Sequence, residues 1–221
     1  MRKTIVVSVV FYSLSAAIYF LAAGRLDLPF GWLYFTLNAI VGLGTVAIAD
    51  AKSAGFAQER LRPAPGERDR LFKPVGTFSS LTLLVIAGLD AGRFHWMPSV
   101  GRPLQLIAFL LDMAGLLLVC WSMVVNSFFS SAVRLQPERK QMVVKSGPYG
   151  VVRHPGYTGG ILYLAMNGLA LGSWWAGLAS MPMLVLTLRR TMMEDAMLQS
   201  GLDGYLDYCK QVRYRLLPGI W

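Results

Sequence analysis

The sequence predicts an all-α polytopic membrane protein with about six transmembrane helices. Hydrophobic residues make up 55% of the 221 residues and charged residues only 15%, and the mean hydropathy is +0.49. A soluble domain carries about 25% charged residues. We therefore expect one integral-membrane domain over residues 1–221, in which 1–125 form scaffold helices and 126–221 form the functional core.

Six apolar runs account for the expected helices. A membrane-spanning helix needs roughly 20 mainly apolar residues. The runs that meet or approach this length are about 5–23, 29–49, 74–92, 103–126, 156–172 and 174–193. The connection at 51–73 contains Pro63-Ala64-Pro65-Gly66, which indicates a loop after a short interfacial helix at about 53–61.

The distribution of basic residues sets the expected orientation. The net charge is +9, which could indicate a nucleic-acid partner. With the N-terminus inside, however, 18 of the 21 Lys and Arg residues fall in cytoplasmic segments, and only Arg25, Arg93 and Arg102 fall outside. This asymmetry is the positive-inside pattern. It predicts cytoplasmic termini, contact with membrane lipids and no nucleic-acid partner.

Cysteine labelling tests this topology. In a cysteine-free background, a single cysteine at Ser99 should react with an impermeant reagent in intact cells. A cysteine at Lys140 should react only after permeabilisation, because 127–153 is expected on the cytoplasmic side. Labelling of position 140 in intact cells would refute the six-span topology.

Metal chemistry is not expected. The chain has two His and two Cys, and Cys120 lies in an expected span whereas Cys209 lies in the C-terminal tail. A structural zinc site takes four closely arranged ligands. These residues indicate neither a metal site nor a disulfide framework.

The last two expected spans bring two polar segments together. Gly172-Ser173 is almost the whole connection between them, which predicts an antiparallel pair. A single helix from 174 to about 198 would rise about 37 Å, so its end would emerge from ~30 Å of hydrocarbon. The start of the first helix, with Arg153, His154 and Tyr157, would then lie near the end of the second, which carries Arg189, Arg190, Glu194 and Asp195.

The start of the fifth span has the composition of a ligand site. Pro155 suits a first helical turn, and His154 before it is biased toward extended geometry. The N–H groups of 156–158 would then lack helical partners and suit an anionic group. In the alternative interpretation, Arg153 and His154 only anchor a helix end at the lipid headgroups.

Two acidic residues, Glu194 and Asp112, have two interpretations each. Glu194 either faces the His154 cluster and a ligand, or forms an i,i+4 surface ion pair with Arg190; its neighbour Asp195 is expected to matter less, since one helical residue rotates it by about 100°. Asp112 in the fourth span is a functional candidate because ionisable residues are rare in membranes. Alternatively, Asp112 is neutral and hydrogen-bonded to Asn38 or Asn167.

The second half of the chain resembles the isoprenylcysteine carboxyl methyltransferase family of integral-membrane enzymes and its bacterial relatives. The residues that carry the resemblance are the G-P-Y…R-H-P-G-Y-T-G run at 147–159, the lead-in from Asn126, and Glu194-Asp195 followed by Leu198, Tyr205 and Tyr208. The similarity extends from Asn126 to Trp221. Asp195 stands where the family pattern has a second glutamate.

The resemblance implies an S-adenosylmethionine-dependent methyltransferase acting on a lipophilic acceptor, such as an isoprenylcysteine-like carboxylate. A carboxylate acceptor needs only an orienting arginine, whereas an amine or hydroxyl needs a base. The implied cofactor-binding residues are Gln136, Val144, Gly147, Pro148, Tyr149, Arg153, His154, Pro155, Tyr157 and Glu194. The implied catalytic residues are His154, Glu194 and Arg190, and the implied substrate-binding residues are Arg189, Arg190 and Asp112.

Two other functions stay open. The tail from Tyr208 to Trp221 is also similar to the C-terminal end of membrane sterol reductases, which use NADPH and share an H-P-x-Y-x-G element. The third possibility is a non-enzymatic membrane scaffold or permease built on the same helices. A scaffold would bind no nucleotide-like ligand, and a reductase would bind NADPH.

Overall fold

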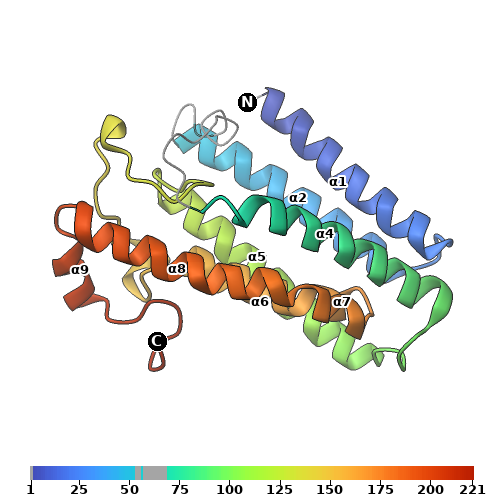
Figure 1. The fold of residues 1–221 in the computed structure, drawn as a ribbon. Coiled ribbons are helices and arrows are strands. Elements are labelled where there is room, and N and C mark those ends of the chain that lie inside the picture. The colour runs from blue at the N-terminus through green and yellow to red at the C-terminus, as the bar shows by residue number, and fades with distance from the viewer. Residues whose placement is uncertain (1, 53–55, 57–68) are drawn as a thin grey trace.

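The computed structural model describes residues 2–52, 56 and 69–221, and every regular element in these ranges is helical (Figure 1). The predicted all-α class is therefore confirmed for the described residues. The predicted interfacial helix at about 53–61 lies outside them, apart from Phe56. The helices are α1 (Arg2–Ala23), α2 (Pro29–Lys52), α4 (Phe72–Gly88), α5 (Arg102–Val125), α6 (Pro155–Ala170), α7 (Trp174–Ala179), α8 (Met181–Gly201) and α9 (Tyr205–Gln211).

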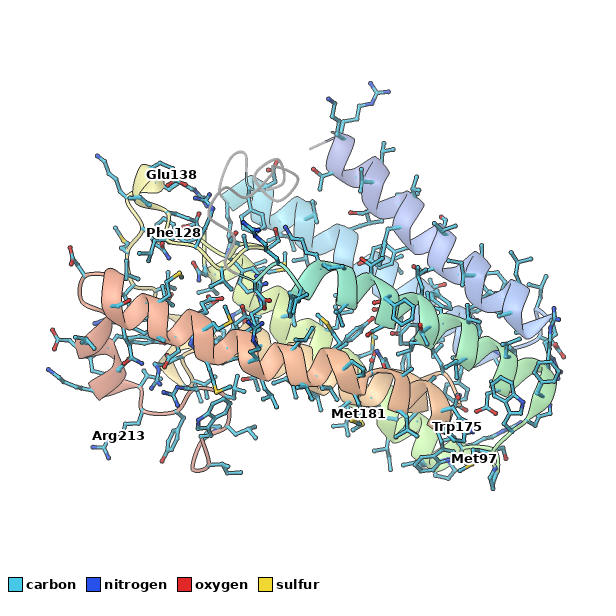
Figure 2. All side chains as sticks on the ribbon, viewed as in Figure 1. Met97, Phe128, Glu138, Trp175, Met181 and Arg213 are labelled. Atoms are coloured by element: carbon cyan, nitrogen blue, oxygen red, sulfur yellow. The ribbon has the colours of Figure 1, made fainter. Side chains whose placement is uncertain are left out.

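Shorter helical pieces complete the chain. The π-helix η1 (Leu89–Phe94) extends α4, and the 3-10 turns η2 (Pro137–Arg139) and η3 (Gly147–Gly150) lie in the long segment between α5 and α6. This segment and α9 both lie at the end of the bundle where α8 ends (Figure 1). The side chains of Phe128, Glu138 and Arg213 mark this end, and Met97 and Trp175 mark the other (Figure 2).

Four helical segments are long and apolar enough to cross a membrane: α1, α2, α4 with η1, and α5. Only 11% of the most apolar window of α1 is buried inside the protein, so this helix suits contact with lipid rather than with a protein core. Four of the six predicted spans thus agree with the structure, and the apolar helices indicate an integral-membrane protein.

The C-terminal helices differ from the prediction. The expected single helix from 174 to about 198 is wrong, because α7 ends at Ala179 and α8 begins at Met181. Ser180 Oγ donates to the carbonyl of Ala176, and Pro182 in the first turn of α8 has no N–H to continue a helical ladder. The 16 residues of α6 are also fewer than the roughly 20 of an upright span.

Glycines allow α5 and α6 to pack backbone to backbone. A Cβ added to Gly115 would lie 2.7 Å from the carbonyl oxygen of Gly159, and one added to Gly159 would lie 2.5 Å from that of Gly115. Small residues permit this approach between membrane helices. The contact fixes the position of α6, which carries the candidate site at its N-terminus.

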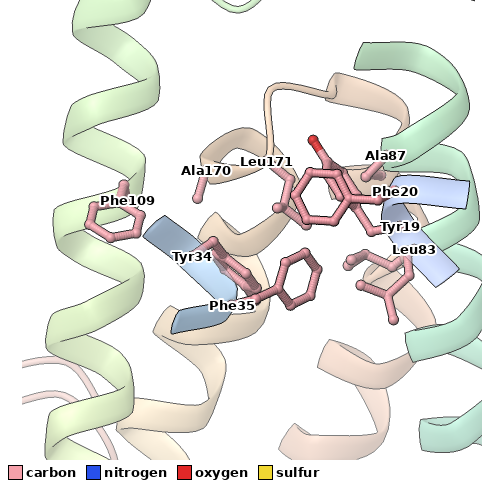
Figure 3. Packing of buried hydrophobic residues seen from close by; sticks show 11 residues of the cluster. Tyr19, Phe20, Tyr34, Phe35, Leu83, Ala87, Phe109, Ala170 and Leu171 are labelled. Carbon is pink, nitrogen blue, oxygen red and sulfur yellow. The ribbon is translucent and has the colours of Figure 1, made fainter. Parts of the chain in front are cut away.

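Two apolar clusters stabilise the ends of the bundle. The first joins α1, α2, α4, α5 and the turn after α6 (Figure 3), and its labelled members are Tyr19, Phe20, Tyr34, Phe35, Leu83, Ala87, Phe109, Ala170 and Leu171. The second packs α9 and the chain after it against α8, through Val133, Met197, Leu198, Tyr205, Tyr208 and Val212. The second cluster thereby holds the tail beside the N-terminus of α6.

Candidate functional site

The start of α6 meets the C-terminal half of α8 at a tyrosine hydroxyl. Tyr157 Oη donates a hydrogen bond to Glu194 Oε2 at 2.5 Å and accepts one from Arg190 Nε at 2.9 Å. At the other end of α6, Ser180 Oγ donates to Asn167 Oδ1, so α6 and α8 run antiparallel. Residues more than 30 positions apart thus form one polar cluster.

Three contacts fix the position of the Arg190 guanidinium. It is 2% exposed, and besides Tyr157 it donates from Nη2 to the carbonyl of Ser131 at 2.9 Å. Its guanidinium lies over the ring of Phe72, 4.2 Å from the centroid, at the distance of a cation–π interaction. The arrangement fixes the cation in place and leaves Glu194 half-buried at its edge.

A second, deeper cluster surrounds Asp195, which is 1% exposed. Arg153 Nε donates to Oδ1 at 2.9 Å, and Arg215 Nε donates to Oδ2 at 2.7 Å. In the described part of the chain, the side chains that contact this carboxylate are Arg153, His154, Gln199, Tyr205 and Arg215. A buried charge is tolerated when it is paired and hydrogen-bonded in this way.

The cluster keeps Asp195 ionised. Burial by itself would raise the pKa of Asp195, but hydrogen bonds from His154, Arg153 and Arg215 outweigh it and hold the pKa well below its ordinary value. Asp195 is therefore a permanent anion at neutral pH.

The hydrogen bonds also assign the protonation of the His154 ring. Tyr205 uses its single proton in the 3.0 Å bond to Asp195 Oδ1. His154 Nε2 lies 3.1 Å from the same oxygen, so a hydrogen bond there requires the proton on Nε2. In the neutral ring, Nδ1 is then the atom that can accept a proton.

The chain after α9 is strapped across the start of α6. The backbone N–H groups of Arg153 and His154 donate to the carbonyls of Tyr214 and Arg215, both at 2.9 Å. Arg153 Nη1 also donates to the carbonyls of residues 212 and 213, at 3.0 and 2.6 Å. Because both side chains are less than 8% exposed, the alternative in which Arg153 and His154 anchor the helix end at lipid headgroups is wrong.

A protein-family comparison matches the part of the chain that makes most of these contacts. Residues 103–200 match the model of the Isoprenylcysteine carboxyl methyltransferase (ICMT) family. We call these residues the ICMT-family region. The region runs from α5 through most of α8 and contains both the Tyr157 cluster and Asp195, and the match supports a membrane methyltransferase in general. No curated protein matches the chain.

The first turn of α6 in the ICMT-family region differs from the prediction. Pro155 begins the helix and His154 precedes it in a non-helical conformation, as expected. The expectation of free N–H groups at 156–158 is wrong for two of them, because those of Tyr157 and Thr158 donate to the carbonyl of His154. Fewer backbone N–H groups in this turn are therefore available to bind an anion than the sequence indicated.

The segment before α6 carries the other expected cofactor residues. Gln136 is 1% exposed. Its side chain donates to the carbonyl of Phe128 and accepts from Arg139 Nη1, and its backbone N–H donates to Gln141 Oε1. Gly147 adopts φ +58°, where glycine is favoured. Pro148 and Tyr149 are buried and Val144 is half-buried. Tyr149 is tied to the tail, since Tyr208 Oη donates to its carbonyl at 2.7 Å.

Two expected substrate residues have other surroundings. Arg189 Nη1 pairs with Asp69 Oδ1 at 3.0 Å. Asp112 is fully buried in α5, and neither of its carboxylate oxygens has a hydrogen-bond partner among the described residues. The expected bond to Asn38 or Asn167 is wrong, because those amide oxygens accept from Tyr163 and Ser180 instead.

Sequence reasoning missed the importance of Asp195, Tyr205 and Arg215. Asp195 was expected to matter less than Glu194, and the other two lie beyond the ICMT-family region. The available signal was Arg153 at the start of an apolar helix: an arginine that becomes buried there needs a paired carboxylate, and Asp195 is the acid next to Glu194 on the facing helix.

Proposed function

We propose that the chain transfers a methyl group from S-adenosylmethionine to a lipophilic acceptor at the membrane. The observation that carries the proposal is the Tyr157 hydroxyl, which links Arg190 to Glu194 beside the buried Asp195 cluster. Its position within the ICMT-family region supports methyl transfer over other chemistries.

The donor set suits this cofactor. S-adenosylmethionine presents an ammonium, a carboxylate and ribose hydroxyls, and it supplies an activated methyl group when bound. Glu194 Oε1 forms no hydrogen bond within the described ranges, so it can accept one from an ammonium or a ribose hydroxyl. Arg190 and Tyr157 hold this carboxylate in position, which is the contribution that a protein makes to cofactor chemistry.

The remaining residues have supporting roles in the proposal. Gly147, Pro148, Tyr149, Pro155 and the backbone near Gln136 and Val144 would form the walls of the cofactor site. Arg153 and His154 are positioning residues, because their side chains bind Asp195. Residues 126–221 would thus be the methyltransferase core on a scaffold formed by 1–125, with both termini in the cytoplasm.

The acceptor decides whether a base is needed. A carboxylate is already nucleophilic and would need only Arg190 to orient it. A hydroxyl must lose a proton, and the groups near the site that can take one are Glu194 and His154 Nδ1. Arg189 and Asp112 are weaker candidates for acceptor contact, since one is paired with Asp69 and the other is enclosed in α5.

Calorimetry in detergent tests the cofactor. We expect S-adenosylmethionine, or its demethylated product, to bind with micromolar affinity, about −8 kcal/mol. NADPH should give no saturable heat, which distinguishes the proposal from the reductase alternative. Binding of NADPH alone would assign the chain to the reductases, and binding of neither ligand would favour the scaffold or permease.

A further inference from the structure

A second cavity lies away from the Tyr157 cluster, inside the helix bundle. It has a volume of about 330 Å³ and lies between α1, α2, α4, α6 and the start of α8. Apolar and aromatic side chains form most of its wall, and the polar residues that line it include Asn38, Ser79, Tyr163 and Asn167. Small-molecule sites have volumes of about 300–1,000 Å³ with mostly apolar walls and a few placed polar groups.

The polar groups of the wall are ordered by one another. Tyr163 Oη donates to Asn38 Oδ1 at 3.1 Å, so its contact with Tyr34 Oη at 2.8 Å requires Tyr34 to donate. Asn38 Nδ2 in turn donates to the carbonyl of Tyr34. This closed ring leaves the oxygen of Tyr34 as an acceptor and fixes both tyrosines before any ligand binds.

Hydrogen-bonding capacity is left over in the same wall. Asn167 uses its amide oxygen to accept from Ser180, but its Nδ2 donates to no partner in the described ranges. The hydroxyl of Ser79 likewise has no partner there. Both residues are at least 94% buried, and buried polar groups are normally satisfied by protein, water or ligand.

The cavity does not suit an anion. No Lys, Arg or His is among the residues that line it. Behind the tyrosine pair lies the fully buried Asp112, close enough to interact electrostatically with both Tyr34 and Tyr163. A carboxylate in the cavity would be buried without a cation, which costs far more than burying a hydroxyl or carbonyl that can be hydrogen-bonded.

A larger groove lies next to the cavity. A groove of about 1000 Å³ follows the outer faces of α1 and α2. Tyr12 and Phe35 line both the groove and the inner cavity. A lipophilic molecule in the groove would therefore be separated from the cavity by these two side chains.

We propose that this cavity binds an uncharged lipophile through a hydroxyl or carbonyl group. The oxygen of the ligand accepts from both Asn167 and Ser79 through its two lone pairs, and a ligand hydroxyl donates to Tyr34. Tyr163 is six residues from Tyr157, or about 9 Å along α6, so one extended molecule can reach from the cavity toward the Tyr157 cluster. That this ligand is the methyl acceptor rests on the proposed function; its binding does not.

A matched pair of probes tests the inference: geraniol, and geranate at pH 8, which share a carbon skeleton and differ in charge. Binding of tritiated geraniol to the purified protein in detergent is measured without cofactor. We expect saturable binding, and competition by geranate at least ten-fold weaker than by unlabelled geraniol. Asn167→Leu should weaken geraniol binding at least ten-fold and Ser79→Ala several-fold. Ser8→Ala, outside the cavity on α1, should leave it unchanged.

Three results would overturn the inference: no saturable geraniol binding to the wild type, competition by geranate equal to that by geraniol, or unchanged affinity in Ser79→Ala. The Ser79 change removes one hydroxyl and keeps the packing, so it decides the matter even if Asn167→Leu does not fold. Failure of S-adenosylmethionine to bind would refute the proposed function and leave this result standing.

Discussion

Asp195→Asn should destabilise the protein by about 3–5 kcal/mol, the usual cost of removing one partner from a buried ion pair. The amide keeps the shape of the side chain but removes the charge that compensates Arg153, which is 7% exposed. It also presents an N–H₂ group where the carboxylate accepts from Arg153, His154 and Arg215. The free energy of unfolding is measured by denaturant titration in mixed micelles.

Glu194→Gln is the matched control for this change. It neutralises the adjacent carboxylate on the same helix, but Glu194 is half-buried and the amide oxygen can still accept from Tyr157. We expect a loss of about 1 kcal/mol or less, as for one neutral hydrogen bond. Equal effects of the two changes would contradict the assignment of Asp195 as the buried centre of the site.

The pH dependence of stability follows from the same group. The pKa of Asp195 is lowered on folding, so the stability it contributes is complete above its unfolded value, about 4, and is lost as the pH falls toward the folded value. The wild type should therefore lose stability steeply below about pH 4. The Asp195→Asn protein should show a shallower decline over the same range, and an unchanged slope would argue against the charged network.

The fold could be predicted from the sequence wherever a long apolar run had no competing local signal. α1, α2, α4 and α5 are such runs, and their observed ends lie close to the expected ones. The prediction failed between 174 and 198 because hydropathy carries no information about caps. Ser180 Oγ donates to the carbonyl of Ala176, and Pro182 has no N–H to continue the helix, so one apolar segment is divided into two helices.

The meeting of two helix ends in the site could be predicted, because the connection between their helices is short. Gly172-Ser173 implied that the start of α6 and the end of α8 come together, and the structure has Tyr157 in contact with Glu194. The partner of Arg153 could not be derived in the same way. It depends on the rotation of α8 about its axis. Tyr205 and Arg215, from a separate part of the chain, contact Asp195 on α8 and help to fix that rotation.

Glu194→Gln should weaken S-adenosylmethionine binding by ten- to a hundred-fold, or about 1.4–2.8 kcal/mol. The loss is that of a charge-assisted hydrogen bond to an ammonium or ribose group. Tyr157→Phe should weaken binding in the same direction but less, because it releases the carboxylate from its 2.5 Å hydrogen bond without removing the charge. Affinity is measured by calorimetry, and Asp203→Asn, an exposed acid beyond the end of α8, serves as the matched control.

The double variant Glu194→Gln, Tyr157→Phe distinguishes a shared site from two independent contacts. If Tyr157 acts by holding Glu194 in place, its hydroxyl is of little use once the charge is gone, so the two losses should sum to more than the loss in the double variant. Arg190→Ala should lower affinity as well, since Arg190 donates to the same hydroxyl. Suppose instead that Glu194→Gln and Arg190→Ala both leave the affinity for S-adenosylmethionine unchanged and alter only thermal stability. The Arg190–Tyr157–Glu194 group would be a structural link between α6 and α8, and the cofactor would have to bind elsewhere.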